Sequence, residues 1–248
     1  GYSGVVNTIN VLDTVGISHM GTYDSPESQK EILIKEVNGL KIAFLSYTYG
    51  TNGIPIPSGK DYCINLIDKD LILSQLKQAK EKNVDLICVN MHWGVEYRLT
   101  PNDEQKELAD FLFKNGADII LGSHPHVLEP MEKRTVTLDD GTEKECFVIY
   151  SLGNFISGQN KENTKSTIIL NLQITKHTDN KITIDSAKYT PLYFHKKGSS
   201  GTKNYTLIDI KKSIANYENG TDKSIGSSLY NTLKSELTQI QKHVGEEI

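Results

Sequence analysis

Cysteine and tryptophan are scarce in this sequence, and long hydrophobic runs are missing. Its 248 residues include three cysteines and one tryptophan. The number of cysteines is odd, and they are widely spaced at Cys63, Cys88 and Cys146 without a Cys-x-x-Cys pair. They therefore do not predict a disulfide framework. No stretch approaches the roughly 18 to 20 continuous apolar residues of a membrane-spanning helix. Two catalytic signatures are also absent, the Gly-x-Ser-x-Gly nucleophile elbow and the Gly-rich phosphate-binding loop.

Charge of one sign is not in excess either. The 27 basic and 31 acidic residues leave a net charge of -4 and are interspersed, which argues against nucleic acid as a partner. Hydrophobic residues make up 37% of the chain and charged residues 23%, as in a folded globular protein rather than a disordered one. This length favours one compact domain with extensions over two independent domains.

The first half of the chain alternates between helix and strand patterns. A short helix is predicted over 5–15, and Asn38-Gly39 lies between two β-rich runs, the strongest short signal for a hairpin. Asp68 or Asp70 can cap a helix that runs to Lys82. The later segments are a strand ending at His92, a helix starting at Pro101 and a strand over 117–122. Short connections in this order indicate right-handed βαβ units in a mostly parallel sheet.

After residue 130 the pattern changes to strands followed by helices. Asp139-Asp140-Gly141 predicts another hairpin, and alternating strands over 167–174 and 181–189 indicate an antiparallel second half of the sheet. A Gly/Ser/Lys linker over 197–204 precedes two polar helices. We therefore expect an α/β fold with a mixed sheet over residues 1–196, followed by a linker and a helical extension over 197–248.

Three histidines mark the ends of two apolar runs. His92 closes the run 84–91, and His124 and His126 follow the run 117–122. Parallel sheets bind their ligands beyond the carboxyl ends of their strands, so the three imidazoles can converge there. Neutral imidazole is the commonest metal ligand. The pattern favours a metal site; the alternative is that these are polar loop residues bonded to local carbonyl groups.

Two further residues are candidates for catalysis. Glu96 follows His92 within one turn of chain and can orient an imidazole, act as a general acid or base, or be an exposed loop charge. Asn154 follows a third apolar strand and can bond a substrate oxygen or simply tolerate a left-handed turn. Arg98 is a possible anion partner at the same edge of the predicted sheet, although a solvated loop charge is the simpler interpretation.

Three motifs together resemble the CapA family of bacterial capsule and poly-γ-glutamate synthesis proteins, a branch of the calcineurin-like metallophosphoesterase superfamily. They are His92-Trp93-Gly94-Val95-Glu96, Gly122-Ser123-His124-Pro125-His126-Val127 and Ser151-Leu152-Gly153-Asn154-Phe155. The resemblance runs from Gly1 to about His195. It implies a four-layer αββα sandwich in which two mixed sheets are covered by helices.

The resemblance also implies a centre of two divalent metal ions, either manganese, zinc or iron, with His92, His124 and His126 among its ligands. Two such ions can clamp a phosphoryl oxygen and activate a water for in-line attack. The sequence departs from the family at its start, because the Asp of a Gly-Asp motif and the Asn-His of an Asn-Asn-His motif do not occur. The chain thus resembles the C-terminal part of such a protein, with the first half of the fold missing. We expect weak or single-metal binding by this chain and no turnover.

Three functions follow as hypotheses. The first is a metal-dependent phosphoesterase-type hydrolase of capsule or poly-γ-glutamate biosynthesis, active at full length. The alternative is a non-catalytic cell-surface component of polymer synthesis or export that binds an anionic polymer. A third is a hydrolase of amides or other esters. The resemblance implies a membrane-anchored protein at the cell surface, membrane-bound capsule synthesis proteins as partners, and an anionic polymer or phosphoester as substrate.

Overall fold

The computed structural model describes residues 1–197 and 204–248, which form two compact units. Most of the expected linker over 197–204 lies outside the described residues. The first unit comprises Gly1–Trp93, Lys106–Gly122 and Arg134–Val148. The second comprises Gly94–Gln105, Ser123–Lys133 and Ile149–Ile248. Each unit is described by itself below.

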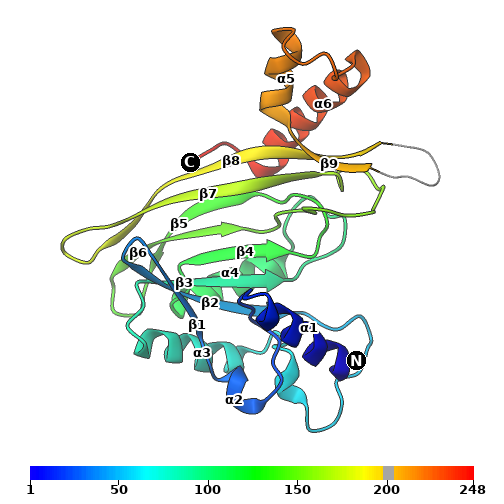
Figure 1. Cartoon of the computed structure of the whole chain (residues 1–248). Coiled ribbons are helices and arrows are strands. Elements are labelled where there is room, and N and C mark those ends of the chain that lie inside the picture. The colour runs from blue at the N-terminus through cyan, green and yellow to red at the C-terminus, as the bar shows by residue number, and fades with distance from the viewer. Residues whose placement is uncertain (198–203) are drawn as a thin grey trace. The chain divides into compact units, whose positions relative to one another are not determined.

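Helices and strands appear largely where their sequence patterns predict them (Figure 1). The helices are α1 (Tyr2–Thr14), α2 (Pro26–Gln29), α3 (Lys69–Glu81), α4 (Asp103–Lys114), α5 (Ile210–Glu218) and α6 (Ser227–Val244), with a 3₁₀ turn at Asp61–Cys63. The strands are β1 (Leu33–Val37), β2 (Leu40–Thr48), β3 (Leu86–His92), β4 (Ile119–Ser123), β5 (Met131–Thr137), β6 (Glu143–Ile149), β7 (Ser166–Lys176), β8 (Ile182–Lys197) and β9 (Asn204–Asp209).

Strands β1 to β6 form one mixed sheet in the order β1-β2-β3-β4-β6-β5. The hairpin between β1 and β2 turns at Asn38 and Gly39, whose φ angles of 51° and 80° are both positive, as a type I′ turn requires. Strand β2 pairs with β3 in parallel, in a register that sets Thr48 opposite His92. The mixed α/β architecture expected from the sequence is therefore confirmed.

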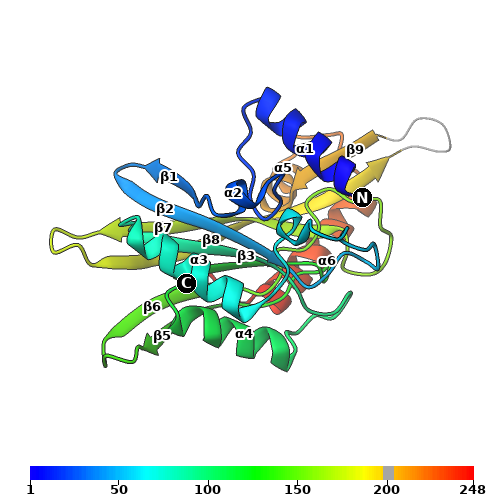
Figure 2. The same ribbon diagram turned by 90° about the horizontal axis from the view of Figure 1, so that it is seen from below.

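Helices α3 and α4 connect consecutive strands of this sheet. Because β2, β3 and β4 advance in one direction across it, right-handed crossovers place both helices on the same face (Figure 2). Asp68, rather than Asp70, caps α3, since its side chain accepts the amide of Leu71 at 2.8 Å. The prediction that α4 begins at Pro101 was wrong. The helix begins at Asp103.

The start of α4 is fixed by a capping box. The Asn102 side chain accepts the Gln105 amide at 2.8 Å, and the Gln105 side chain accepts the Asn102 amide at 3.0 Å. Two amides at the start of the helix are satisfied in this way, so the helix begins after Asn102 and Pro101 lies outside it.

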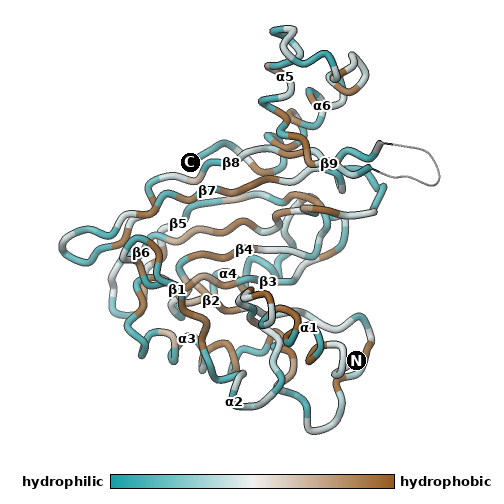
Figure 3. Tube along the Cα trace, in the orientation of Figure 1, coloured by the Kyte–Doolittle hydropathy of each residue, from teal (hydrophilic) through white to brown (hydrophobic). Residues whose placement is uncertain are grey.

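Hydrophobic runs coincide with the central strands (Figure 3). In β3 the side chains of Leu86, Ile87, Cys88, Val89 and Met91 are all buried. Such uninterrupted burial is typical of a strand covered on both faces. The strand cannot therefore leave its place in the sheet without exposing this core.

The second unit contains an antiparallel sheet in the order β7-β8-β9. Strand β9 was not expected, because its sequence lies at the end of the predicted linker. Helices α5 and α6 pack on this sheet with Ile210, Leu233 and Ile240 fully buried. Across the described residues, every helix is too short or too polar to span a membrane.

Candidate metal centre

Two loops of the second unit carry the candidate site. One, over 94–102, lies between β3 and α4, and the other, over 124–130, lies between β4 and β5. The backbone amide of Tyr97 donates to the carbonyl of Pro125 at 2.7 Å. This bond joins the loop of Glu96 directly to the turn between His124 and His126.

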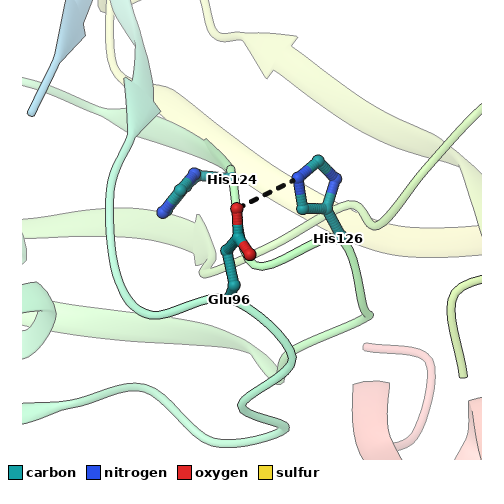
Figure 4. A group of neighbouring side chains, drawn as sticks. All are labelled: Glu96, His124 and His126. Atoms are coloured by element: carbon teal, nitrogen blue, oxygen red, sulfur yellow. Dashed lines mark ion pairs between the residues drawn. The ribbon is translucent and has the colours of Figure 1, made fainter. Parts of the chain in front are cut away.

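Glu96, His124 and His126 form a group whose donor atoms lie within 4.8 Å of one another (Figure 4). The Nε2 atom of His126 is 3.9 Å from Oε1 of Glu96, and the two imidazole rings are 6.1 Å apart between centroids. The side chain of Glu96 is half exposed, while both histidines are partly buried. An exposed carboxylate therefore faces two more constrained imidazoles.

The backbone holds both histidines in conformations that non-glycine residues seldom adopt. The φ angles are 100° at His124 and 62° at His126. Positive φ outside glycine costs on the order of 1 to 3 kcal/mol per residue and tends to occur at functional sites. The turn therefore holds the two imidazoles in place at an energetic cost, which the stability of the rest of the fold offsets.

Asn154 sets the tautomer of His126. Its amide nitrogen donates to the backbone carbonyl of Thr164 and to the Gln159 side chain, so its oxygen must face His126. That oxygen is 2.8 Å from Nδ1 of His126 and can only accept. In the neutral ring Nδ1 therefore carries the proton, and Nε2, on the side of Glu96, is the nitrogen left to bind an ion. This is how metal-binding histidines are normally oriented.

Burial lowers the pKa of His124 from its ordinary value, an effect opposed by the negative charge of Glu96 and reinforced by His126. The sign follows from solvation, because a partly buried imidazole is more easily accommodated neutral than charged. Neutral imidazole is the form that binds metals.

The donor set suits a divalent cation. Two imidazole nitrogens and one carboxylate match zinc, iron and manganese chemistry. Donors that share one zinc ion lie about 3 to 3.5 Å apart, given bond lengths of about 2.0 to 2.1 Å. The present spacing of up to 4.8 Å is wider than this, so a shared ion would require the donors to move together, and Glu96 is the exposed one of the three. Three protein donors leave further coordination positions open, as in catalytic rather than structural sites.

Truncating Asn154 to alanine is expected to weaken metal binding by about 10- to 100-fold, the usual effect of losing a group that orients a ligand. His126 would then be free to change tautomer and turn its ring. Calorimetric titration with zinc or manganese measures the change. Asn171→Ala is the matched control, because Asn171 is exposed on β7 and bonds only within its own strand. Equal affinities for Asn154→Ala and the natural chain would contradict the orienting role.

His92 ends β3 in the first unit and is not one of the three grouped residues. Its ring stacks on Tyr49 with centroids 5.8 Å apart. It also lines a cavity of about 400 Å³ whose wall is formed largely by the loop over 50–57.

The site contains contacts that the sequence motifs did not suggest. Glu96 was expected to orient a histidine, transfer protons or be solvated, and the structure places it beside His124 and His126, where it could also share an ion with them. Tyr97 and Gln159 were not singled out, yet the Tyr97 ring stacks on His126 at 5.9 Å and its hydroxyl accepts from Gln159 at 3.3 Å. The position of Tyr97 directly after Glu96 was the only available signal.

The fold and the site together define a mixed α/β protein with a candidate centre of two histidines and one carboxylate. The chain belongs to the family described as bacterial capsule synthesis protein PGA_cap, which matches residues 1–159. The family resemblance carried by the three motifs is thereby confirmed.

Two relatives bear names from the same process. The chain is 31% identical over 173 residues to the capsule biosynthesis protein CapA of Bacillus anthracis, a match covering 68% of this chain and 40% of that protein. It is 30% identical over 209 residues to the PGA biosynthesis protein CapA of Bacillus subtilis (strain 168), covering 84% and 51%. The chain spans about half the length of these relatives.

Solved structures give only remote likenesses. The NAD nucleotidase of Haemophilus influenzae is 14% identical with a TM-score of 0.41, over 85% of this chain and 37% of that one. A 5'-nucleotidase precursor from Thermus thermophilus is 18% identical with a TM-score of 0.40, over 65% and 29%. Likenesses at this level do not bear on the chemistry of the site.

Proposed function

We propose that this chain is part of a metal-dependent hydrolase of the phosphoesterase type that acts in capsule or poly-γ-glutamate biosynthesis. The observation that carries the proposal is the convergence of Glu96, His124 and His126, with Nε2 of His126 oriented for a ligand by Asn154. Membership in the capsule synthesis family supports the biological setting. We propose the cell envelope as its location, with a membrane anchor in the longer protein and membrane-bound synthesis proteins as its partners.

A divalent ion at this group would supply Lewis acidity toward a phosphoryl oxygen. The chain's own residues have separate tasks. His124 and His126 would hold the ion, and Asn154 keeps the proton of His126 on Nδ1. The exposed Glu96 can act as a third donor. The second ion of the centre that the family resemblance implies needs donors beyond these three, and we propose that the longer proteins supply them.

The second candidate is a non-catalytic component that binds an anionic polymer at the cell surface. Exposed apolar side chains directly after Asn154 support it, since Phe155 and Ile156 are 53% and 66% exposed. Such side chains beside polar groups suit contact with an extended polymer. The two candidates share the metal group and differ in whether a bond is broken.

Metal affinity of the 248-residue chain tests the proposal. We expect one zinc or manganese ion per chain. The His124→Ala, His126→Ala double variant should bind it more than about 100-fold more weakly, because even an orienting partner alone is worth about 10- to 100-fold. His177→Ala is the control, since His177 is exposed and bonds Thr183 away from the group. Equal metal affinity in the double variant and the natural chain would overturn the metal centre.

Catalysis is tested with a protein of the length of the relatives, using bis-p-nitrophenyl phosphate. We expect metal-dependent hydrolysis that the same double substitution abolishes, and no turnover by the 248-residue chain. Polymer binding without hydrolysis at full length would favour the non-catalytic candidate instead.

A further inference from the structure

A closed ring of contacts holds Tyr97 against the candidate metal group. Its ring stacks on His126 at 5.9 Å with an interplanar angle of 24°. Its hydroxyl accepts from Gln159 at 3.3 Å, Gln159 accepts from Asn154 at 3.0 Å, and Asn154 bonds His126. The φ of Tyr97 is 66°, another left-handed conformation. Tyr97 is therefore a fixed part of the site wall rather than a mobile surface ring.

Lys161 places a positive charge on this wall. Its ammonium lies 3.6 Å from the centre of the Tyr97 ring, a close cation–π contact. No carboxylate of the described residues lies within ion-pair distance of this ammonium. Since the residue itself is exposed, its charge remains available to an anionic group in solution.

Lys161 lies close enough to the histidines for one bound molecule to contact both. The distances of 3.6 Å and 5.9 Å put the ammonium within about 10 Å of the centre of the His126 ring. The ammonium can directly contact an anionic group that lies further along a bound molecule.

We propose that Tyr97 and Lys161 form an anion subsite beside the metal group, which selects substrates with a second negative charge next to the group bound at the histidines. This inference rests on the proposed function. An oligomer with closely spaced carboxylates, the anionic polymer of the second candidate function, carries charges in this arrangement and binds through the metal group that both candidates share. Tyr97 orients the ammonium, and Lys161 is the residue that determines specificity.

Binding of a short γ-linked glutamate oligomer to the zinc-loaded 248-residue chain tests the subsite. Inorganic phosphate, which has only one charged group, is the comparison ligand. Lys161→Met is expected to weaken oligomer binding about 10-fold, the loss of one charged contact worth about 1.4 kcal/mol. Phosphate affinity and zinc content should not change. Lys161→Arg should retain the oligomer affinity, because arginine keeps the charge and stacks on aromatic rings.

Lys165→Met is the matched control, since it removes a lysine of the same segment that has no ring contact with Tyr97, and it should bind the oligomer as the natural chain does. Equal oligomer affinity in Lys161→Met and the natural chain would overturn the subsite. So would a zinc-loaded natural chain that binds phosphate but not the oligomer. Zinc binding that persists after His124 and His126 are replaced would instead count against the proposed function.

Discussion

Replacing Glu129 by glutamine is expected to stabilise the folded chain by about 3 kcal/mol at pH 8 and to change its stability little near pH 4.5. Glu129 is fully buried. One carboxyl oxygen accepts from the Gln105 side chain at 2.7 Å, and in the described part of the chain the other has no hydrogen-bond partner. Burial raises the pKa of this carboxyl to about 7, although Gln105 and the charge of Arg98 work in the opposite direction.

The sign follows from proton linkage. Between about pH 4.5 and about pH 7 the folded chain keeps a proton on Glu129 that the unfolded chain has released. The free energy of unfolding therefore falls as pH rises through this window and stays reduced above it. The difference between an ordinary pKa of 4.5 and one of about 7 corresponds to about 3 kcal/mol. Glutamine has no charge to bury and can still accept from Gln105.

Urea unfolding of both chains from pH 4 to pH 8.5 measures the effect. The natural chain and Glu129→Gln should have similar stability at the acid end and diverge steadily to about pH 7. Glu107→Gln controls for the loss of a carboxylate, because Glu107 is exposed on α4. Parallel stability curves for Glu129→Gln and the natural chain across the whole range would show that the carboxyl titrates normally.

Asp118→Ala is expected to destabilise the chain by about 3 kcal/mol, the low end of the cost of removing one partner of a buried ion pair, because the side chains of Asp118 and Lys144 are still 15% and 19% exposed. Asp118 directly precedes β4. Its carboxylate accepts the Ile87 amide of β3 at 2.7 Å and pairs with Lys144 at 2.8 Å. Alanine would leave the Ile87 amide without this acceptor and the Lys144 ammonium without its counter-charge.

Asp110→Ala provides the comparison, since Asp110 forms an ion pair with Arg134 but is itself largely exposed. Exposed pairs contribute about 0 to 1 kcal/mol, so this variant should unfold at nearly the same urea concentration as the natural chain. Equal losses of stability in the two variants would mean that the burial of Asp118 does not determine its contribution.

The sequence predicted those parts of the fold that short-range physics determines. The Asn38-Gly39 turn, the cap of α3 and the strand ending at His92 each depend on residues within a few positions of one another. The start of α4 was misplaced because Pro101 is a weaker signal than the capping box of Asn102 and Gln105. Strand β9 was missed because the Gly/Ser/Lys composition before it predicted a linker, although its pairing partner β8 is the preceding strand of the chain.

The candidate site also contains some residues that local sequence predicts and others that only tertiary contacts define. His124 and His126 could be selected from their spacing and from the strand before them. The role of Asn154 could not, because its contact with His126 joins residues that are 28 positions apart. The burial of Glu129 had one sequence signal, an acidic residue between Leu128 and Pro130 in an apolar stretch. Its raised pKa depends on tertiary packing, which no local pattern contains.

The left-handed turn at His124 and His126 has a kinetic consequence. Because the hydrogen bond from the Tyr97 amide to the Pro125 carbonyl holds this turn, binding of an ion as proposed would require little more than exchange of solvent molecules and rotation of Glu96. The entropy of ordering this turn is lost when the chain folds and not when the metal binds. Metal exchange should therefore be rapid, and selectivity among ions should arise from the geometry of the turn rather than from its closure.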